Sequence, residues 1–154
     1  MKTEYIAEDG QIFTSEEECK KYEMSELFMI NKQLKRMTDK KITSYDINDR
    51  LLEDETVEIF EIKTEKDLEN LRRYLYLQGI KNGMSEDYIK SCFTSENEKR
   101  SDFVFDNVTF GHEVMIFWTC DKDWFWVYRD GSINGYCEYF RDRITNLIIP
   151  ESKE

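Results

Sequence analysis

The sequence is poor in residues that break regular structure and in long apolar runs. Its 154 residues include only six glycines and one proline, so long irregular loops and low-complexity linkers are not expected. The longest strictly apolar run is Val114 to Trp118, far shorter than the roughly 20 residues of a membrane span. The first residues, MKTEYIAEDG, lack the apolar core of a signal peptide. We therefore expect a cytoplasmic protein without a membrane segment.

Sequence signatures of catalysis and of metal binding are also missing. The only histidine is His112, and no Gly-x-Ser-x-Gly, His-Glu-x-x-His or P-loop pattern is present. The four cysteines, Cys19, Cys92, Cys120 and Cys137, are scattered and form no Cys-x-x-Cys pair. We therefore predict a protein that is not an enzyme, with no metal, no cofactor and reduced thiols. A small enzyme with carboxylates converging on His112 is an alternative.

Basic residues are outnumbered in this chain. There are 22 Lys and Arg against 33 Asp and Glu, which gives a net charge of −11. Binding to nucleic acid depends on the neutralisation of phosphates by Lys and Arg, so direct nucleic-acid binding is not expected. A host protein with a basic surface is the partner that this charge favours.

What the chain does contain is a concentration of aromatic residues. The stretch from Phe103 to Tyr128 holds nine of the 22 aromatic side chains and all three tryptophans. Its pattern predicts an antiparallel hairpin with strands over 113–120 and 123–128. Alternation gives both faces of these strands an apolar character. Either the strands are central and covered on both sides, or one aromatic face is open and binds a partner.

The remaining pattern predicts an α+β fold, with this antiparallel sheet and its aromatic central hairpin (about 113–128) packed against helices. The other expected elements are a β-hairpin over 3–13, a long helix from Ser15 to about Met37, a strand over Thr56–Lys63, a helix from Thr64 to a cap at Gly79, a short helix after Ser85 and a closing helix over 132–149. We interpret 1–154 as a single domain, with 1–40 as a candidate hairpin–helix subdomain and 56–149 as the main α+β body.

The N-terminal segment YIAEDGQIFTSEEECKKYE resembles the start of small accessory proteins encoded by phages and mobile elements of low-GC Gram-positive bacteria. The resemblance covers about residues 1–23 and is carried by Tyr5, Asp9, Gly10, Phe13, Ser15, Glu17, Glu18, Cys19, Tyr22 and Glu23. It implies a genomic setting in a bacterial host cell, and it carries no catalytic residue. An acidic protein from such a setting can imitate the phosphates of DNA.

The candidate partner-binding residues are carboxylates and tryptophans. The carboxylates are Glu16, Glu17 and Glu18, with Glu23 and Glu26 on the same helix, and Glu53, Asp54 and Glu55 in a loop; the aromatic anchors are Trp118, Trp124 and Trp126. We expect a non-enzymatic inhibitor of a host nucleic-acid-targeting protein, similar to anti-CRISPR proteins. The alternative is a structural domain that self-associates through an aromatic homodimer interface.

Overall fold

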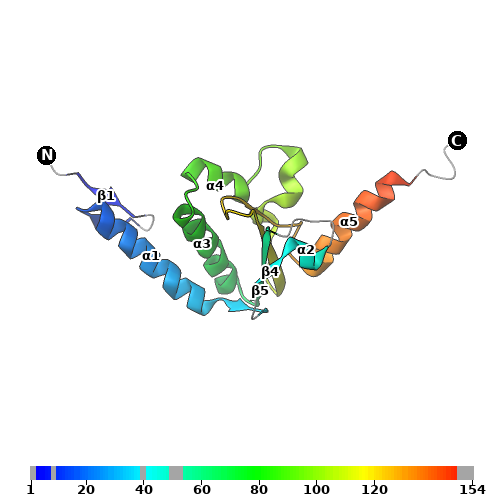
Figure 1. Cartoon of the computed structure of the whole chain (residues 1–154), viewed down its shortest axis with the longest axis horizontal. Helices are drawn as coiled ribbons and strands as arrows, with labels where there is room; N and C mark the ends of the chain where they lie inside the picture. Colours follow the sequence, from blue (N-terminus) through cyan, green and yellow to red (C-terminus); the bar gives the residue numbers. More distant parts are fainter. Residues whose placement is uncertain (1–2, 8–9, 39–40, 49–53, 149–154) are drawn as a thin grey trace.

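The computed structural model describes residues 3–7, 10–38, 41–48 and 54–148. The molecule is elongated, with an antiparallel sheet at its centre and one long helix extending toward each end (Figure 1). These helices are α1 (Glu16–Gln33) and α5 (Ile133–Leu147). The structure confirms an α+β fold with an N-terminal β-hairpin, β1 (Tyr5–Ile6) and β2 (Ile12–Phe13), followed by a long helix.

The central sheet has five strands. They are β3 (Lys35–Arg36), β4 (Ile42–Thr43), β5 (Thr56–Ile62), β6 (His112–Trp118) and β7 (Phe125–Trp126). Their order is β3-β5-β6-β7, and β4 also pairs with β5, so two short strands share one edge of β5. Every pairing in the sheet is antiparallel. The predicted strand over 56–63 is thus present as β5, and it pairs with the aromatic strand β6.

The predicted aromatic hairpin is present, but its second strand is much shorter than expected. Phe117 pairs with Trp126 and Trp118 pairs with Phe125, and the ladder stops there. In the connection, the Thr119 hydroxyl accepts a hydrogen bond from the Asp123 amide at 3.2 Å. The Thr119 amide also donates to the Trp124 carbonyl at 3.0 Å, so one backbone bond extends the hairpin toward the turn. After Trp126 the chain leaves β6, and the Val127 amide donates to the Phe103 carbonyl at 3.2 Å instead.

Helix α1 begins where it was predicted, because the Ser15 hydroxyl accepts a hydrogen bond from the Glu18 amide. The predicted end near Met37 is wrong. The helix stops at Gln33, and Lys35 and Arg36 pair with Glu61 and Phe60 of β5. Pairing with β5 therefore outweighs the helix propensity of Lys35 and Arg36, whose local sequence favours continuing the helix.

Helix α3 (Glu65–Lys81) has the predicted capping box between Thr64 and Asp67. The predicted cap at Gly79 is wrong, because Gly79 is buried inside the helix. A Cβ atom there would lie 2.5 Å from Ile89 Cδ1, so this glycine allows α4 (Glu86–Phe93) to approach. Gly83, with φ of +93°, adopts the left-handed conformation that was assigned to Gly79.

Two short 3-10 helices, Glu98–Phe103 and Phe105–Asn107, connect α4 to β6. The first overlaps the polar segment 94–102, which the sequence pattern predicts as the longest loop. A short helix, α2 (Ser44–Ile47), follows β4.

The sheet is covered on both faces, although unequally. Helices α1, α3 and α4 lie on one side, and α2 and α5 lie on the other (Figure 1). The larger cluster includes the fully buried Phe60, Ile62, Leu71, Leu75, Leu77, Ile89, Val114, Ile116, Trp118 and Val127; the smaller one is built on Val57, Met115 and Phe117. Burial of one such side chain stabilises the fold by about 2 to 3 kcal/mol. The interpretation of central, covered strands is therefore the one that the structure supports.

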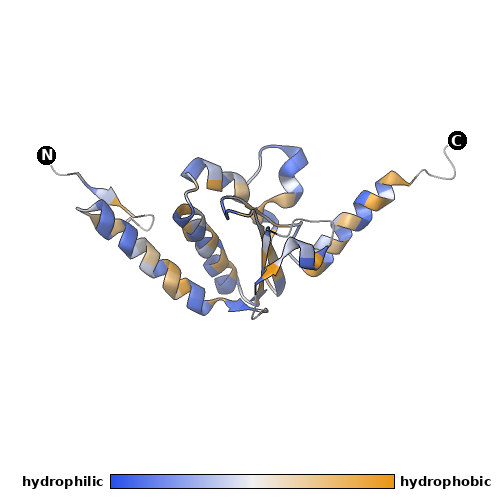
Figure 2. Ribbon diagram, in the orientation of Figure 1, coloured by the Kyte–Doolittle hydropathy of each residue, from blue (hydrophilic) through white to orange (hydrophobic). Residues whose placement is uncertain are grey.

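Helix α5 differs from the expected closing helix. It begins at Ile133 with Ser132 as its N-cap, and its first half contacts the sheet. Its apolar side chains toward the C-terminal end are exposed, with Ile144 at 60% and Leu147 at 82% exposure. Figure 2 shows these hydrophobic residues along the part of α5 that extends away from the body. The sheet thus covers only part of the apolar face of α5.

Candidate functional site

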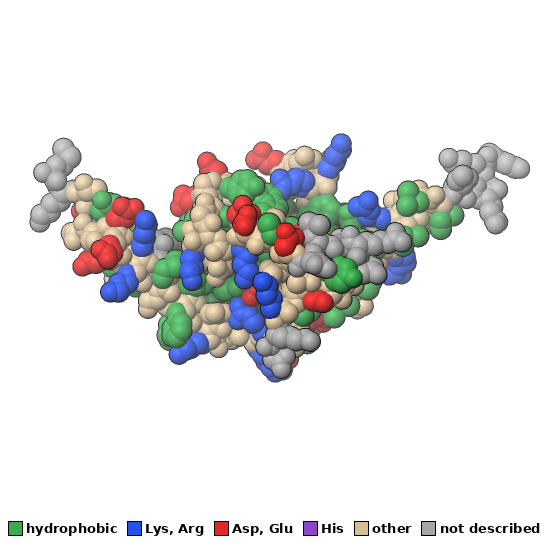
Figure 3. Space-filling model, viewed as in Figure 1, with side chains coloured by type: hydrophobic (Ala, Val, Ile, Leu, Met, Phe, Trp, Pro, Cys, Tyr) green, Lys and Arg blue, Asp and Glu red, His purple; other side chains and the backbone are tan. Residues whose placement is uncertain are grey.

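The predicted carboxylates lie in two separate places. Glu16, Glu17 and Glu18 are exposed in the first turn of α1, at one end of the molecule, where acidic side chains gather in Figure 3. Asp54 and Glu55 lead into β5 at the centre. The structure therefore does not bring the two groups together. Glu53 and the side chain of Glu23 lie outside the described residues.

Other acidic residues do lie near the central pair. Loss of part of its hydration raises the pKa of the exposed Cys120 thiol, and the charges of Asp121, Asp54 and Asp123 add to this rise. Burial, followed by the charge of Asp54, also raises the pKa of Glu55. Carboxylates from two loops thus surround the start of β5 and the β6–β7 connection, a grouping that sequence spacing did not reveal.

Glu26 is engaged inside the fold rather than available on the surface. Both of its carboxylate oxygens accept hydrogen bonds from the Arg73 guanidinium, at 2.7 Å each. This pair joins α1 to α3. Of the acidic residues predicted on α1, Glu26 therefore has a structural role.

The three tryptophans occupy three different environments. Trp118 is completely buried and donates its indole N–H to Glu58 at 2.8 Å, so it has no surface to offer a partner. Trp124 packs against the larger cluster and Trp126 against the smaller one. Alternation along the predicted strand 123–128 places Trp124 and Trp126 on one face, and this prediction is wrong, because β7 begins only at Phe125. Both side chains are nevertheless partly exposed.

Trp124 and Trp126 border the same pocket, which we call the aromatic pocket. It has a volume of about 240 Å³ and is lined by Ser91, Cys92, Arg100, Phe103, Trp124, Phe125, Trp126 and Tyr128. The Arg100 guanidinium lies 4.6 Å from the centre of the Trp124 ring, and the Tyr88 ring packs edge-on against the same indole. The Trp124 ring thus already makes a cation–π contact within the protein, and Arg100 adds a positive charge to the pocket lining.

An aromatic cluster continues from this pocket toward α5. Trp126 stacks on Phe117, Phe117 stacks on Tyr136, and Tyr136 contacts Phe140, with ring centres 4.7 to 6.1 Å apart. Burial raises the pKa of Tyr128, which lies within this cluster. The cluster ends at a groove of about 750 Å³, lined by Ile47, Asn48, Tyr136, Cys137, Phe140, Arg141, Ile144 and Thr145. We call it the α5 groove.

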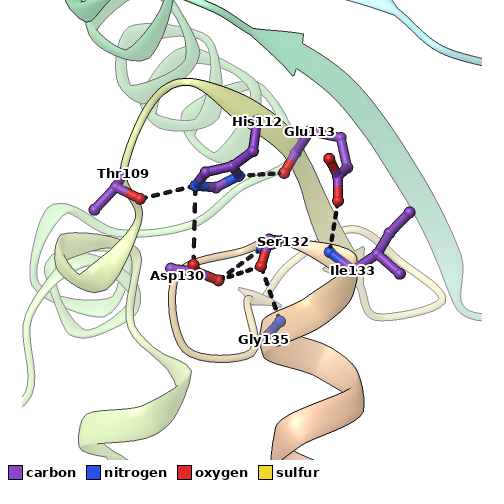
Figure 4. A network of polar contacts seen from close by, with 7 residues as sticks. All are labelled: Thr109, His112, Glu113, Asp130, Ser132, Ile133 and Gly135. Carbon is purple, nitrogen blue, oxygen red and sulfur yellow. Dashed lines mark hydrogen bonds and ion pairs between the residues drawn. The ribbon is translucent and has the colours of Figure 1, made fainter.

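The polar residues around His112 form a structural network, which Figure 4 shows. The ring nitrogens of His112 contact the Thr109 hydroxyl at 2.8 Å and the Glu113 carbonyl at 2.6 Å. Its Nε2 lies 3.9 Å from Asp130, and the Ser132 hydroxyl donates to that aspartate while accepting from the Gly135 amide. Ser132 thus serves as the N-cap of α5. Its hydroxyl donates to Asp130 and not to His112, so His112 is not placed to activate it as a nucleophile.

The described residues provide no group of three or more His, Cys, Asp and Glu side chains placed to hold a metal ion. Cys19 and Cys92 are buried, whereas Cys120 and Cys137 are exposed. Burial raises the pKa of Cys92 to about 11, which keeps this thiol protonated beside the aromatic pocket. None of the helices in the described part of the chain has the length and apolar character that a membrane span requires.

Six of the eight pocket residues were not singled out from the sequence as binding residues, and Arg100 and Phe103 are two of these six. Both belong to the first 3-10 helix, Glu98–Phe103. Phe103 carried a signal, since it opens the aromatic stretch, whereas nothing in the local sequence connects Arg100 with Trp124. No family model, curated protein or solved structure matches this chain.

Proposed function

We propose that this protein is a non-enzymatic binding module that docks onto a basic surface of another protein and uses the aromatic pocket as a local anchor. The observation that carries the proposal is the pocket bordered by the partly exposed Trp124 and Trp126. The Arg100 guanidinium already lies over the Trp124 ring, so the pocket suits an apolar or aromatic side chain of the partner better than a second cation. Tryptophan is common among the residues that dominate binding energy at interfaces.

The charge of the chain supports the same partner. A net charge of −11 attracts a basic surface, and exposed charges are screened over about 8 Å at physiological salt. Association is therefore fast at low salt and slower at high salt. In this mechanism the exposed carboxylates steer the partner, and the aromatic pocket fixes it in place.

The narrower form of the proposal concerns the identity of the partner. An acidic protein that binds a basic groove can block a host protein that targets nucleic acid, as an anti-CRISPR-like inhibitor does in the cytoplasm of a bacterial host. Support comes from the net charge and from the phage-like residues 1–23. Glu16, Glu17 and Glu18 are the exposed carboxylates best placed to imitate phosphates.

The proposal is tested by affinity capture from a bacterial host lysate at low and high salt, followed by titration of the captured protein. We expect Trp124→Ala to weaken binding at least tenfold, since a buried aromatic anchor contributes about 2 kcal/mol or more. Phe110→Ala is the matched control, because Phe110 is an exposed aromatic residue that does not line the pocket. A partner that binds the Trp124→Ala variant as tightly as the wild type would exclude the pocket as the anchor.

Charge reversal tests the electrostatic step separately. We expect Glu16→Lys, Glu17→Lys and Glu18→Lys together to slow association while the dissociation rate stays nearly constant. Circular dichroism verifies that the domain is still folded. Association that ignores both salt and the reversal would contradict steering by these carboxylates.

Self-association is a second candidate function, and α5 provides the observation that favours it. Ile144, Leu147 and Ile148 are exposed beside the α5 groove, and exposed apolar patches often mark interfaces. Light scattering on the purified protein distinguishes the two functions. A dimer that becomes monomeric with Ile144→Glu, and is unaffected by salt, would favour self-association.

A further inference from the structure

A second pocket, which we call the basic pocket, opens where β4 and β5 approach the β6–β7 connection. Its volume is about 390 Å³, and its lining residues are Arg36, Thr38, Lys41, Thr56, Val57, Glu58 and Lys122. It shares no lining residue with the aromatic pocket or the α5 groove. Figure 3 shows Lys and Arg side chains gathered over the middle of the viewed face, where Figure 1 places β4 and β5.

The charged residues that line this pocket are mainly basic, although the chain as a whole is acidic. Arg36, Lys41 and Lys122 come from three different segments and face a single carboxylate, that of Glu58. Within the described part of the chain, no carboxylate lies within ion-pair distance of Lys41 or Lys122. The Asn82 side chain donates a 3.0 Å hydrogen bond to the Lys122 carbonyl, which fixes the backbone of this lysine.

The carboxylate of Glu58 is already neutralised by Arg36, and each of its two oxygens already accepts two hydrogen bonds. Oε2 of Glu58 accepts hydrogen bonds from Nε and Nη2 of Arg36, at 3.0 and 2.8 Å. Its Oε1 accepts from the Tyr74 hydroxyl at 2.7 Å and from Trp118 at 2.8 Å. Glu58 therefore does not satisfy the two lysines. The residues that line the pocket retain two unmatched positive charges, while Asp54, Asp121 and Asp123 lie nearby outside the lining.

Thr56 provides an independent indication of a ligand. It is only 6% exposed and lines the basic pocket, and among the described residues its hydroxyl has no hydrogen-bond partner. Buried hydroxyl groups are nearly always hydrogen-bonded, because loss of water without a replacement partner is unfavourable. A ligand with acceptor oxygens in this pocket would satisfy the Thr56 hydroxyl and the two lysines together.

We propose that the basic pocket binds a phosphate group, either as free phosphate or as the phosphate of a small molecule such as a nucleotide. The lysines supply two positive charges for a dianion, whereas the charge of Arg36 is matched by that of Glu58. A tetrahedral phosphate has acceptor oxygens that point in several directions, which suits donors arriving from separate segments. The site does not depend on the partner-binding function.

Isothermal titration tests the site with inorganic phosphate, a nucleoside monophosphate and acetate as probes at constant ionic strength. We expect phosphate or the nucleotide to bind, and acetate to bind at least tenfold more weakly, since it is a planar monoanion. Tighter binding of the nucleotide than of phosphate would assign the source to a small phosphorylated molecule. Absence of binding by both phosphate probes, or equal binding of acetate, would overturn the proposal.

Variants locate the bound phosphate group. Lys122→Gln and Lys41→Gln should each weaken binding about tenfold, since each removes one charge-assisted contact. Lys66→Gln is the control, because Lys66 is exposed, as Lys41 is, and does not line the pocket. Thr56→Val should weaken binding with the fold intact, and Thr56→Ser should restore it. Equal affinity of the Thr56→Val, Lys122→Gln and wild-type proteins would place the phosphate elsewhere and overturn the site.

Discussion

The indole N–H of Trp118 donates a 2.8 Å hydrogen bond to the carboxylate of Glu58 on the neighbouring strand. Glu58 lies on the same face of β5 as the buried Phe60 and Ile62, so a charged group is enclosed by the larger cluster. Burial, together with the charge of Glu58, raises the pKa of the Tyr74 hydroxyl far above its usual range, and this tyrosine remains a hydrogen-bond donor at physiological pH. The polar network thus fixes β3, β5, β6 and α3 to one another.

The first prediction concerns this network. Glu58→Gln removes the charge that opposes Arg36 and replaces an acceptor with a donor, so that Tyr74 and Trp118 compete for one oxygen. We expect the free energy of unfolding to fall by about 2 to 4 kcal/mol, as measured by urea denaturation. Glu61→Gln on the same strand is the control, because Glu61 pairs with the exposed Lys35 and Lys63. An equal loss for both variants would contradict a special role for Glu58.

The second prediction concerns Gly79 and Gly83, two positions that each require glycine for a different reason. Gly79→Ala places a methyl group against Ile89 and Met84, so we expect a loss of about 1 to 3 kcal/mol in spite of the better helix propensity of alanine. Gly83→Ala meets no neighbouring atom but must adopt a positive φ, which costs about 1 to 2 kcal/mol. Shortening Ile89 to valine should recover part of the loss at Gly79 and none at Gly83. Thermal denaturation of the three single and two double variants measures this coupling.

The third prediction is a pH dependence at the start of α5. Burial opposes ionisation of Asp130, but hydrogen bonds from Ser132 and the charge of His112 outweigh it and lower the pKa of Asp130. A carboxyl whose pKa is lower in the folded state stabilises the protein above its unfolded pKa, about 3.9. That contribution is lost as the pH falls through the folded pKa. Nuclear magnetic resonance titration of the Asp130 carboxyl should therefore give a midpoint below that of an unfolded control peptide.

Asp130→Asn provides the matching stability measurement. The asparagine oxygen can still accept from Ser132, while the charge near the helix N-terminus is removed. We expect a loss of at most about 1 kcal/mol at neutral pH, since Asp130 is partly exposed. The difference between the two proteins should shrink below about pH 4. A difference that stays constant between pH 7 and pH 2 would show that the charge contributes nothing.

The fourth prediction concerns thiol reactivity. Cys120 and Cys137 are exposed and should react with a thiol reagent in the folded protein, whereas Cys19 and Cys92 should react only after unfolding. Because nearby aspartates help to raise the pKa of Cys120, its labelling rate should increase with salt as their charges are screened. Mass spectrometry of labelled peptides measures each site. Rapid labelling of Cys92 in the native protein would contradict its burial.

Much of the fold could be predicted from the sequence, because the strongest local signals agree with the final structure. The capping residues Ser15, Thr64, Ser85 and Ser132 each begin a helix as expected. Strand β5 was also recognised from its β-branched and aromatic residues. These features depend on neighbouring residues, which is the range over which sequence patterns are informative.

The wrong predictions fall where contacts between residues far apart in the sequence determine the local structure. Lys35 and Arg36 leave the helix to pair with β5, and Gly79 is required by the approach of Ile89 rather than by a helix end. The aromatic pocket depends on Arg100 meeting Trp124, which no spacing predicts. Glu58 could have been noticed, since alternation places this carboxylate on the same face of β5 as Phe60 and Ile62.

The pairing of β5 with β6 has a consequence for how the chain reaches its native state. The paired residues closest in sequence, Ile62 and His112, are 50 positions apart (112 − 62), and α3 and α4 lie between them. Helices form from local contacts, whereas this sheet must close a long loop first. During synthesis on the ribosome, the edge of β5 that faces β6 therefore stays unpaired until Trp118 has been synthesised. Its apolar face stays uncovered during the same interval. Chaperone protection during that interval would matter more for this protein than for one whose neighbouring strands follow each other along the chain.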